Sequence, residues 1–144
     1  MNRADDALLR FKQGFNCSQS VLSAFAPSYG LDHKLALKVA QAFGGGMARS
    51  GETCGAVTGA FMVIGLKHGQ GEDTDSQAKE KTYEIVREFV QRFESIHGSI
   101  LCRELIGYNL SVPEEMRIIH QQNLFETLCP HFVQDAVNIL EKIL

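Results

Sequence analysis

The stretch Cys54-Gly55-Ala56-Val57-Thr58-Gly59-Ala60-Phe61-Met62-Val63-Ile64-Gly65-Leu66 is apolar on nearly every side when it is wound into a helix. A helix that is apolar all round must be buried, so we expect residues 54–67 to form the central helix of the fold. Gly55 and Gly59 are four residues apart and therefore share one helix face. Because glycine costs about 1 kcal/mol relative to alanine inside a helix, this pair predicts that another backbone packs closely near Cys54.

The rest of the chain also carries helical periodicity. We find no alternation of period two, no internal repeat and no linker. The flanking helices are expected at residues 2–13, 16–26, 32–43, 73–97, 99–107, 111–125 and 129–144. The sequence therefore predicts an all-α fold, a single-domain multi-helix bundle of about seven or eight helices that spans residues 1–144.

Capping residues and proline set several of these helix ends. Asn16 with Gln19 has the pattern of a capping box, and Asp32 is expected to cap the third helix. Cys129-Pro130 is expected to start the last helix, because proline is favoured in a first helical turn. The side chains expected to face inward are Leu35, Val39 and Phe43 in the third helix and Tyr83, Val86, Val90, Phe93 and His97 in the longest one.

Composition excludes several classes of function. The chain has 144 residues and a formal net charge of −3, and it lacks the dense basic runs with aromatic residues that nucleic-acid binding requires. The polar start Met1–Asp6 does not resemble a signal peptide, and the longest apolar run is too short to cross a bilayer. We therefore expect no membrane insertion and a cytoplasmic protein, in which widely spaced cysteines are more often redox-active or metal-binding than structural disulfides.

Four cysteines, Cys17, Cys54, Cys102 and Cys129, fall at or near predicted helix starts. A helix N-terminus has unpaired N–H groups and a partial positive charge, which favour the thiolate form. The shared pattern predicts that the four thiols form one site. No Cys-x-x-Cys pair is present, which excludes the thioredoxin motif and the common zinc-ribbon spacing and leaves the pairing open.

Cys54 is the strongest candidate for a reactive thiol. It follows the glycine-rich loop Gly44–Glu52, and Arg49 in this loop is expected to lower its pKa together with the helix terminus. A solvated surface charge is the alternative role for Arg49. His131 could add a ligand or proton donor beside Cys129, although we favour a half-exposed polar histidine. We expect His97 near the last carbonyls of its helix, and His33, His68 and His120 on the surface.

The segment Cys54-Gly55-Ala56-Val57-Thr58-Gly59 is similar to the CGAxxG element of the C_GCAxxG_C_C family of redox-active proteins. The other three cysteines match the remaining positions of the family motif in order, so the resemblance covers nearly the whole chain. It implies a small, mostly helical protein with a four-cysteine redox site, often encoded near transporters. A similar module in split-Soret-type cytochromes implies a cluster-like iron site.

Three functions are compatible with these residues. The first is thiol–disulfide chemistry, with Cys54 attacking, Cys17 as its partner, and Cys102 with Cys129 as a second pair or relay. The second is a metal site in which the four thiolates bind zinc or an iron–sulfur cluster, with Gly55 and Gly59 beside the cofactor. The third is a redox sensor that binds another protein. The redox partner stays unknown, and the apolar stripe of the last helix is either core or a homodimer face.

Overall fold

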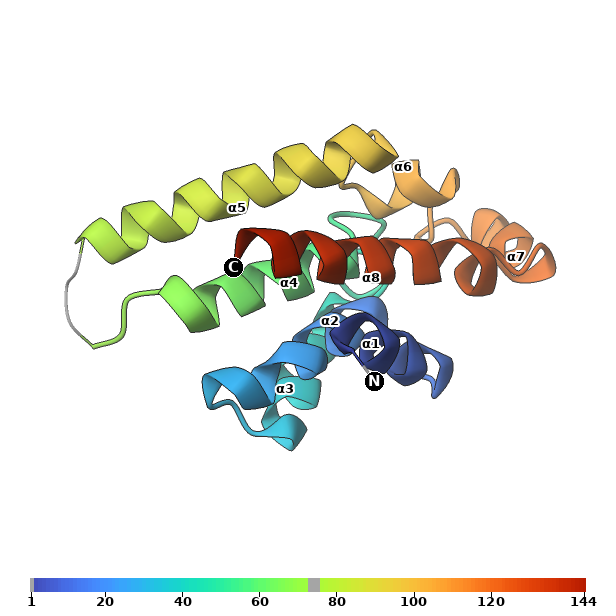
Figure 1. The fold of residues 1–144 in the computed structure, drawn as a ribbon. Helices are drawn as coiled ribbons and strands as arrows, with labels where there is room; N and C mark the ends of the chain where they lie inside the picture. Colours follow the sequence, from blue (N-terminus) through green and yellow to red (C-terminus); the bar gives the residue numbers. More distant parts are fainter. Residues whose placement is uncertain (1, 73–75) are drawn as a thin grey trace.

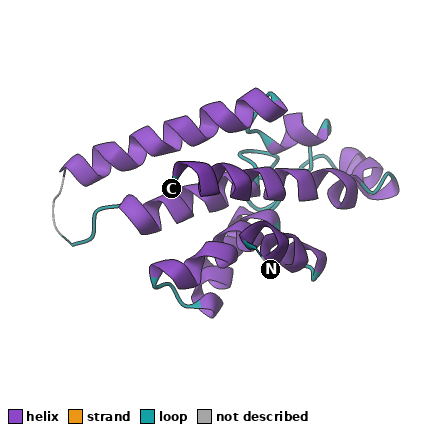
Figure 2. Ribbon diagram, viewed as in Figure 1, coloured by secondary structure: helices purple, strands orange, loops and turns teal. Residues whose placement is uncertain are grey.

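The computed structural model describes residues 2–72 and 76–144, and this part of the chain is all-α, as predicted (Figures 1 and 2). The helices are α1 (Arg3–Lys12), α2 (Cys17–Phe25), α3 (His33–Ala40), α4 (Gly55–His68), α5 (Ser76–His97), α6 (Cys102–Ile106), α7 (Pro113–Gln121) and α8 (Leu124–Ile143). Short 3-10 turns at Ala26–Tyr29 and Gln41–Phe43 follow α2 and α3. Within the described residues, β pairing is limited to one antiparallel bridge between Thr53 and Leu101.

Helix α4 is the central helix, as its apolar sequence predicted. Every residue from Cys54 to Ala60 is buried, and Val63 and Ile64 are fully enclosed. Helices α2, α5 and α8 all pack on it. Figure 1 shows α5 and α8 running along one side of α4, with α1, α2 and α3 gathered on the other.

The close backbone approach to α4 is made by α2. A Cβ atom added at Gly59 would lie 2.8 Å from the carbonyl oxygen of Ser18, and one at Gly55 would lie 3.0 Å from the Ser18 nitrogen. Real Cβ atoms essentially never come as close as the contact at Gly59, and the one at Gly55 is tighter than nine in ten real contacts, so glycine is what permits this spacing. The contact places the N-terminus of α2 against the N-terminus of α4.

On the opposite side of α4, aromatic side chains join α5 to α8. The Phe93 and Phe132 rings lie 6.4 Å apart, and the His97 ring packs edge-on against Phe132 at 5.0 Å. His97 also hydrogen-bonds Asp135 of α8 at 2.8 Å, rather than the last carbonyls of its own helix. This layer is built from large interlocking side chains.

The predicted inner face of α5 was wrong at Tyr83, which is 49% exposed, and it omitted Phe89, which is fully buried. Residues 85, 89 and 93 repeat at the helical spacing of four, so the buried stripe passes through Phe89 and turns away from Tyr83. The expected start at Asp73 lies outside the described residues.

Helix α3 also turns a different face inward from the predicted one. Asp32 caps it as expected, accepting a hydrogen bond from the Leu35 nitrogen at 3.1 Å. However, Leu35 and Val39 are each 52% exposed, whereas Ala36 and Ala40 are completely buried. Small side chains face α2 because they allow the two helices to approach closely, and this left the larger residues outside.

The C-terminal helix begins earlier than predicted. Asn123 separates α7 from α8. It adopts a left-handed conformation with φ of 54°, and α8 starts at the next residue. Cys129 and Pro130 therefore lie inside α8 rather than at its start. Asparagine tolerates left-handed geometry better than most residues, so it can end one helix and begin another without glycine.

Two further features complete the fold. The helix predicted from residue 99 begins later than expected, because Leu101 occupies the cap position and Cys102 is the first residue of α6. Ser99 precedes the helix, where it accepts a hydrogen bond from the Leu101 nitrogen and donates one to Glu104. None of the helices in the described parts of the chain is both long and apolar enough to cross a membrane.

Candidate functional site: a cavity lined by four cysteines

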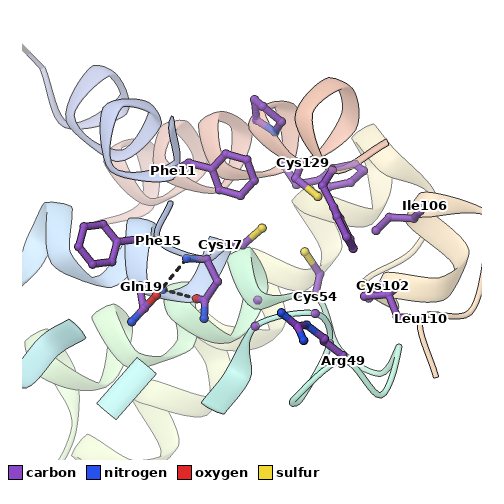
Figure 3. A pocket seen from close by; sticks show the side chains of 18 of the residues that line it. Phe11, Phe15, Cys17, Gln19, Arg49, Cys54, Cys102, Ile106, Leu110 and Cys129 are labelled. Carbon is purple, nitrogen blue, oxygen red and sulfur yellow. Dashed lines mark hydrogen bonds between the residues drawn. The ribbon is translucent and has the colours of Figure 1, made fainter. Parts of the chain in front are cut away.

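The fold brings together the four cysteines, Cys17, Cys54, Cys102 and Cys129. All four line one cavity of about 1090 Å³, none forms a disulfide, and none is more than 9% exposed. They come from four separate places, namely the starts of α2, α4 and α6 and the interior of α8. In Figure 3, the sulfur atoms of Cys17, Cys54 and Cys129 point toward one another.

A capping box places Cys17 at the first position of α2. The Asn16 side chain accepts a hydrogen bond from the Gln19 nitrogen at 2.9 Å, and the Gln19 side chain accepts one from the Asn16 nitrogen at 3.0 Å (Figure 3). Both amides also reach across to the α3 region, where they donate to the carbonyls of Gln41 and Leu37. This network confirms the predicted cap and anchors the start of α2 at the cavity.

A short antiparallel contact positions Cys54 and Cys102 together. The Cys54 nitrogen donates to the Ile100 carbonyl at 2.7 Å, and the Cys102 nitrogen donates to the Glu52 carbonyl at 2.6 Å. These bonds flank the Thr53–Leu101 bridge and tie the start of α4 to the start of α6. Two cysteines that are far apart in the sequence are thus held by backbone hydrogen bonds next to their own residues.

The glycine-rich loop forms one wall of the cavity. Residues 45–49 all have positive φ, between 51° and 70°, although Met47, Ala48 and Arg49 are not glycine. A left-handed conformation costs roughly 1–2 kcal/mol for each such residue, so the surrounding contacts must impose it. A Cβ atom at Gly46 would lie 2.7 Å from the Cβ of Cys102, which shows how tightly the loop covers this cysteine.

The pKa of Cys54 is raised, whereas the sequence predicts that it is lowered. Burial raises the pKa of the Cys54 thiol to about 12, although the N–H groups of Ala56 and Val57 at the start of α4 act in the lowering direction. Burial likewise raises the pKa of Cys102 to about 12, with the charges of Cys54 and Cys129 adding to the effect. Desolvation of an anion outweighs the helix terminus here, because the thiolate would lose its water. Cys54 is therefore a protonated thiol at neutral pH.

Cys17 and Cys129 line the same cavity, and their sulfur atoms point toward each other (Figure 3). A hydrogen bond with the Cys129 side chain, followed by burial and by the charges of the other three cysteines, raises the pKa of Cys17 well above its ordinary value. Cys129 lies more than one turn inside α8, so the predicted capping role for this residue was wrong. The four thiols form one coupled group in which each thiolate makes the next harder to form.

The predicted accessory residues have different positions. Arg49 is exposed at the cavity, and Gly55 lines it beside Cys17, whereas Gly59 faces the backbone of α2. His131 is exposed. Across residues 2–72 and 76–144, no group of three or more His, Cys, Asp or Glu side chains is placed to hold a metal ion.

Sequence reasoning missed the apolar wall around the thiols. Phe11 lies near the sulfur atoms, whereas the ring of Phe15 lines a more distant part of the cavity and points away from them (Figure 3); Phe125 and Leu105 line the cavity as well. A signal was present in the sequence, because two large aromatic residues, Phe11 and Phe15, lie just before Cys17. These rings make the cavity mostly apolar apart from its rim.

The fold and the site together define an all-α protein with four cysteines in one buried cavity. The chain belongs to the C_GCAxxG_C_C family, which is described as putative redox-active protein and which matches residues 15–143. No similar curated protein and no similar solved structure was found.

Proposed function

We propose that this protein is a dithiol–disulfide redox protein in which Cys17 and Cys129 form the reversible disulfide. The observation that carries this proposal is that both cysteines line one cavity with their sulfur atoms pointing toward each other (Figure 3). The sequence predicts Cys54 as the partner of Cys17, whereas the effect of Cys129, the largest cause of the raised pKa of Cys17, favours Cys129. Membership of a family of redox-active proteins supports the same chemistry.

The raised pKa of Cys17 assigns different roles to the two sulfur atoms. We assign the attack to Cys129 and the resolving step to Cys17, because the raised pKa of Cys17 keeps this thiol protonated while Cys129 reacts. Cys129 attacks one sulfur of a substrate disulfide, and the released thiolate takes up a proton. Cys17 then loses its proton and attacks Cys129, which forms the internal disulfide and releases the second substrate thiol. One disulfide is reduced to two thiols while two cysteine thiols are oxidised.

Cys54 and Cys102 are buried thiols that do not take part in the first exchange reaction. Because the pKa of each is raised to about 12, both stay protonated while the first pair reacts. Keeping them neutral also protects Cys17 and Cys129 from further repulsion in the reduced state. Because they line the same cavity, we assign them the role of a second pair or relay.

The test is to equilibrate the anaerobic, metal-free protein with thiol–disulfide buffers of increasing potential and to map the disulfides by peptide mass spectrometry. Cys17–Cys129 is expected to form first. Cys17→Ser should accumulate a mixed disulfide on Cys129, whereas Cys129→Ser should accumulate little. The matched variants Cys54→Ser and Cys102→Ser should still form the Cys17–Cys129 bond. Four thiols that stay reduced in every mild oxidant would refute the proposal.

A second candidate, a four-thiolate metal site, rests on the mutual effect of the thiols. The charges of Cys129, Cys54 and Cys102 all act to raise the pKa of Cys17, so four thiolates would need a cation to neutralise them. Zinc or an iron–sulfur cluster would supply that charge. The ligand groups of the described residues do not converge on a single ion, which disfavours one tetrahedral zinc.

Metal content and the visible spectrum of anaerobically purified protein separate the two candidates. A brown protein with visible absorbance supports a cluster, and a colourless protein with one bound zinc supports a structural ion. Metal-free protein that forms the Cys17–Cys129 bond supports the dithiol mechanism.

A further inference from the structure

The four thiols are reachable only through the cavity. None of them is more than 9% exposed, so a disulfide on the surface of a folded protein cannot approach their sulfur atoms. A cavity of about 1090 Å³ does admit a small molecule, and ordinary ligand pockets hold roughly 300–1,000 Å³. Access therefore selects for a substrate of low molecular weight.

The cavity wall selects for an apolar, ring-containing substrate. Phe11 and Phe15 are half-buried and line the cavity from one side, while Phe125 and Leu105 line it elsewhere (Figure 3). Among the described residues, neither Phe11 nor Phe15 packs against another ring. Both rings are only partly buried and line the cavity, so an aromatic ligand inside it would contact them by offset or edge-to-face packing.

The rim of the cavity selects for an acidic group. Arg49 and Lys12 are exposed lining residues, and within the described chain neither side chain has a hydrogen bond or ion pair. Glu126 is the acidic residue of the lining, which leaves an excess of positive charge. The left-handed loop holds Arg49 beside the cavity at a conformational cost, and an arginine fixed in this way suits a carboxylate ligand.

We infer that the oxidising substrate of this site is a small aromatic disulfide that carries an acidic group, with a ring against Phe11 and its acidic group at Arg49. This inference rests on the proposed dithiol mechanism for its chemistry, but its binding part can be tested separately. Cys129 attacks one sulfur of the bound disulfide and forms a mixed disulfide, and the first aromatic thiol leaves. Cys17 then attacks Cys129 and displaces the second aromatic thiol, so two protons and two electrons pass to the substrate.

The experiment measures how the rate of thiol oxidation depends on the concentration of each disulfide in stopped flow. The probes are dithiobis(nitrobenzoate), which is aromatic and doubly acidic, dithiodipyridine, which is aromatic and neutral, glutathione disulfide, which is polar, and insulin. The rate with dithiobis(nitrobenzoate) should saturate, because binding precedes reaction. Glutathione disulfide and insulin should react slowly and without saturation.

Charge variants identify the role of Arg49. Arg49→Gln should raise the half-saturating concentration of dithiobis(nitrobenzoate) by about threefold, the range expected for an exposed ion pair, and should leave that of dithiodipyridine unchanged. Arg49→Lys should restore most of the affinity. Arg87→Gln is the matched control, because it removes the same charge from the exposed face of α5. Phe11→Leu should weaken both aromatic probes equally.

The outcomes distinguish this inference from the proposed function. Linear rates for every probe, equal rates with insulin, or identical behaviour of Arg49→Gln and Arg87→Gln would overturn the assignment of the substrate. If the Cys17–Cys129 disulfide still forms in that case, the dithiol mechanism survives without it. Saturation that depends on Arg49, with no internal disulfide afterwards, would keep the binding site and reject the mechanism.

Discussion

The two sides of α4 are packed by different physical means. Toward α2 the contact runs from backbone to backbone, because Gly55 and Gly59 have no side chains to separate the helices. Toward α5 and α8 it is made by large rings, among them Phe93 and Phe132. The first side holds Cys17 and Cys54 with little tolerance for displacement. The second buries more apolar surface and should supply more of the stability.

This contrast separates stability from the geometry of the site. Ring packing is strong, but side chains can adjust to a change by shifting rotamers. A backbone contact through glycine contributes less buried surface and cannot adjust without moving a whole helix. Damage on the ring side should therefore reduce the free energy of unfolding most, whereas damage on the glycine side should affect the cysteines most.

Among single substitutions, the largest effect is expected from Phe93→Ala on the ring side. Removing this fully buried ring should lower the free energy of unfolding by about 3–5 kcal/mol, measured by denaturant titration. Because Phe93 does not line the cavity, the folded variant should still form the Cys17–Cys129 disulfide at the wild-type rate. Ile96→Ala is the control, since Ile96 is 57% exposed and should change stability by no more than about 0.5 kcal/mol. If the Cys17–Cys129 disulfide forms more slowly in the folded Phe93→Ala variant, the proposed separation of stability from site geometry is wrong.

Gly59→Ala should have a smaller effect on stability but a larger one on the site. The added Cβ would meet the Ser18 carbonyl oxygen at 2.8 Å, so α2 must move, at a cost of about 1–3 kcal/mol. Disulfide formation between Cys17 and Cys129 should slow as α2 shifts. In the same helix, Gly65→Ala meets nothing within 4 Å and should stabilise the protein by about 0.5–1 kcal/mol. Equal behaviour of the two variants would contradict the backbone contact.

The buried thiols predict a loss of stability in alkali. The pKa of Cys54 and that of Cys102 are raised by burial from 9.0 to about 12, so both stay protonated in the folded state after they ionise in the unfolded chain. Their contribution is complete below pH 9 and is lost as the pH rises toward 12. The slope is about 1.4 kcal/mol per pH unit for each thiol.

This pH dependence can be assigned by comparison with a variant. The free energy of unfolding is measured by denaturant titration between pH 8 and about 11 for the reduced protein and for Cys54→Ser/Cys102→Ser. The difference between the two proteins cancels the contribution of the other titrating groups. The variant should show the shallower decline. Parallel curves would mean that these thiols ionise as easily in the folded protein as in the unfolded chain.

The smallest effect is expected at Ser18, on the glycine side. Its hydroxyl is buried and has no hydrogen-bond partner among the described residues. Since an unsatisfied buried hydroxyl is unfavourable, Ser18→Ala should raise the free energy of unfolding by about 1 kcal/mol. Ser20→Ala is the counterpart, because the Ser20 hydroxyl donates to the Asn16 carbonyl at 2.8 Å and its loss should not stabilise. Destabilisation by Ser18→Ala would show that this hydroxyl has a partner in solution.

Much of the fold could be predicted from local patterns. The capping box at Asn16 and Gln19, the cap at Asp32 and the apolar helix after Cys54 each depend on residues a few positions apart. The close approach signalled by Gly55 and Gly59 was also correct, although the pattern did not name α2 as the neighbour. Local patterns were misleading at Cys129-Pro130. Pro130 lies inside α8, and the residue that precedes this helix is Asn123 in a left-handed conformation.

The orientation of helices was harder to predict than their existence. In α3 the larger residues Leu35 and Val39 are exposed, because alanine allows closer packing against α2. In α5 the buried stripe passes through Phe89, a residue that the predicted inner face omitted. A helix face is chosen by its neighbours, and these come from distant parts of the chain.

By itself, the sequence determined an all-α chain, a buried central helix with a glycine contact, and four cysteines of a redox-active family. Only the tertiary structure decided that the four cysteines share one cavity, that Cys17 interacts with Cys129, and that burial raises the pKa of Cys54. The physical reason is the separation along the chain of the residues that produce each effect. Caps and helix periodicity act over one or two turns, whereas desolvation sums over atoms that α1, α2, α4, α6 and α8 bring together around each sulfur.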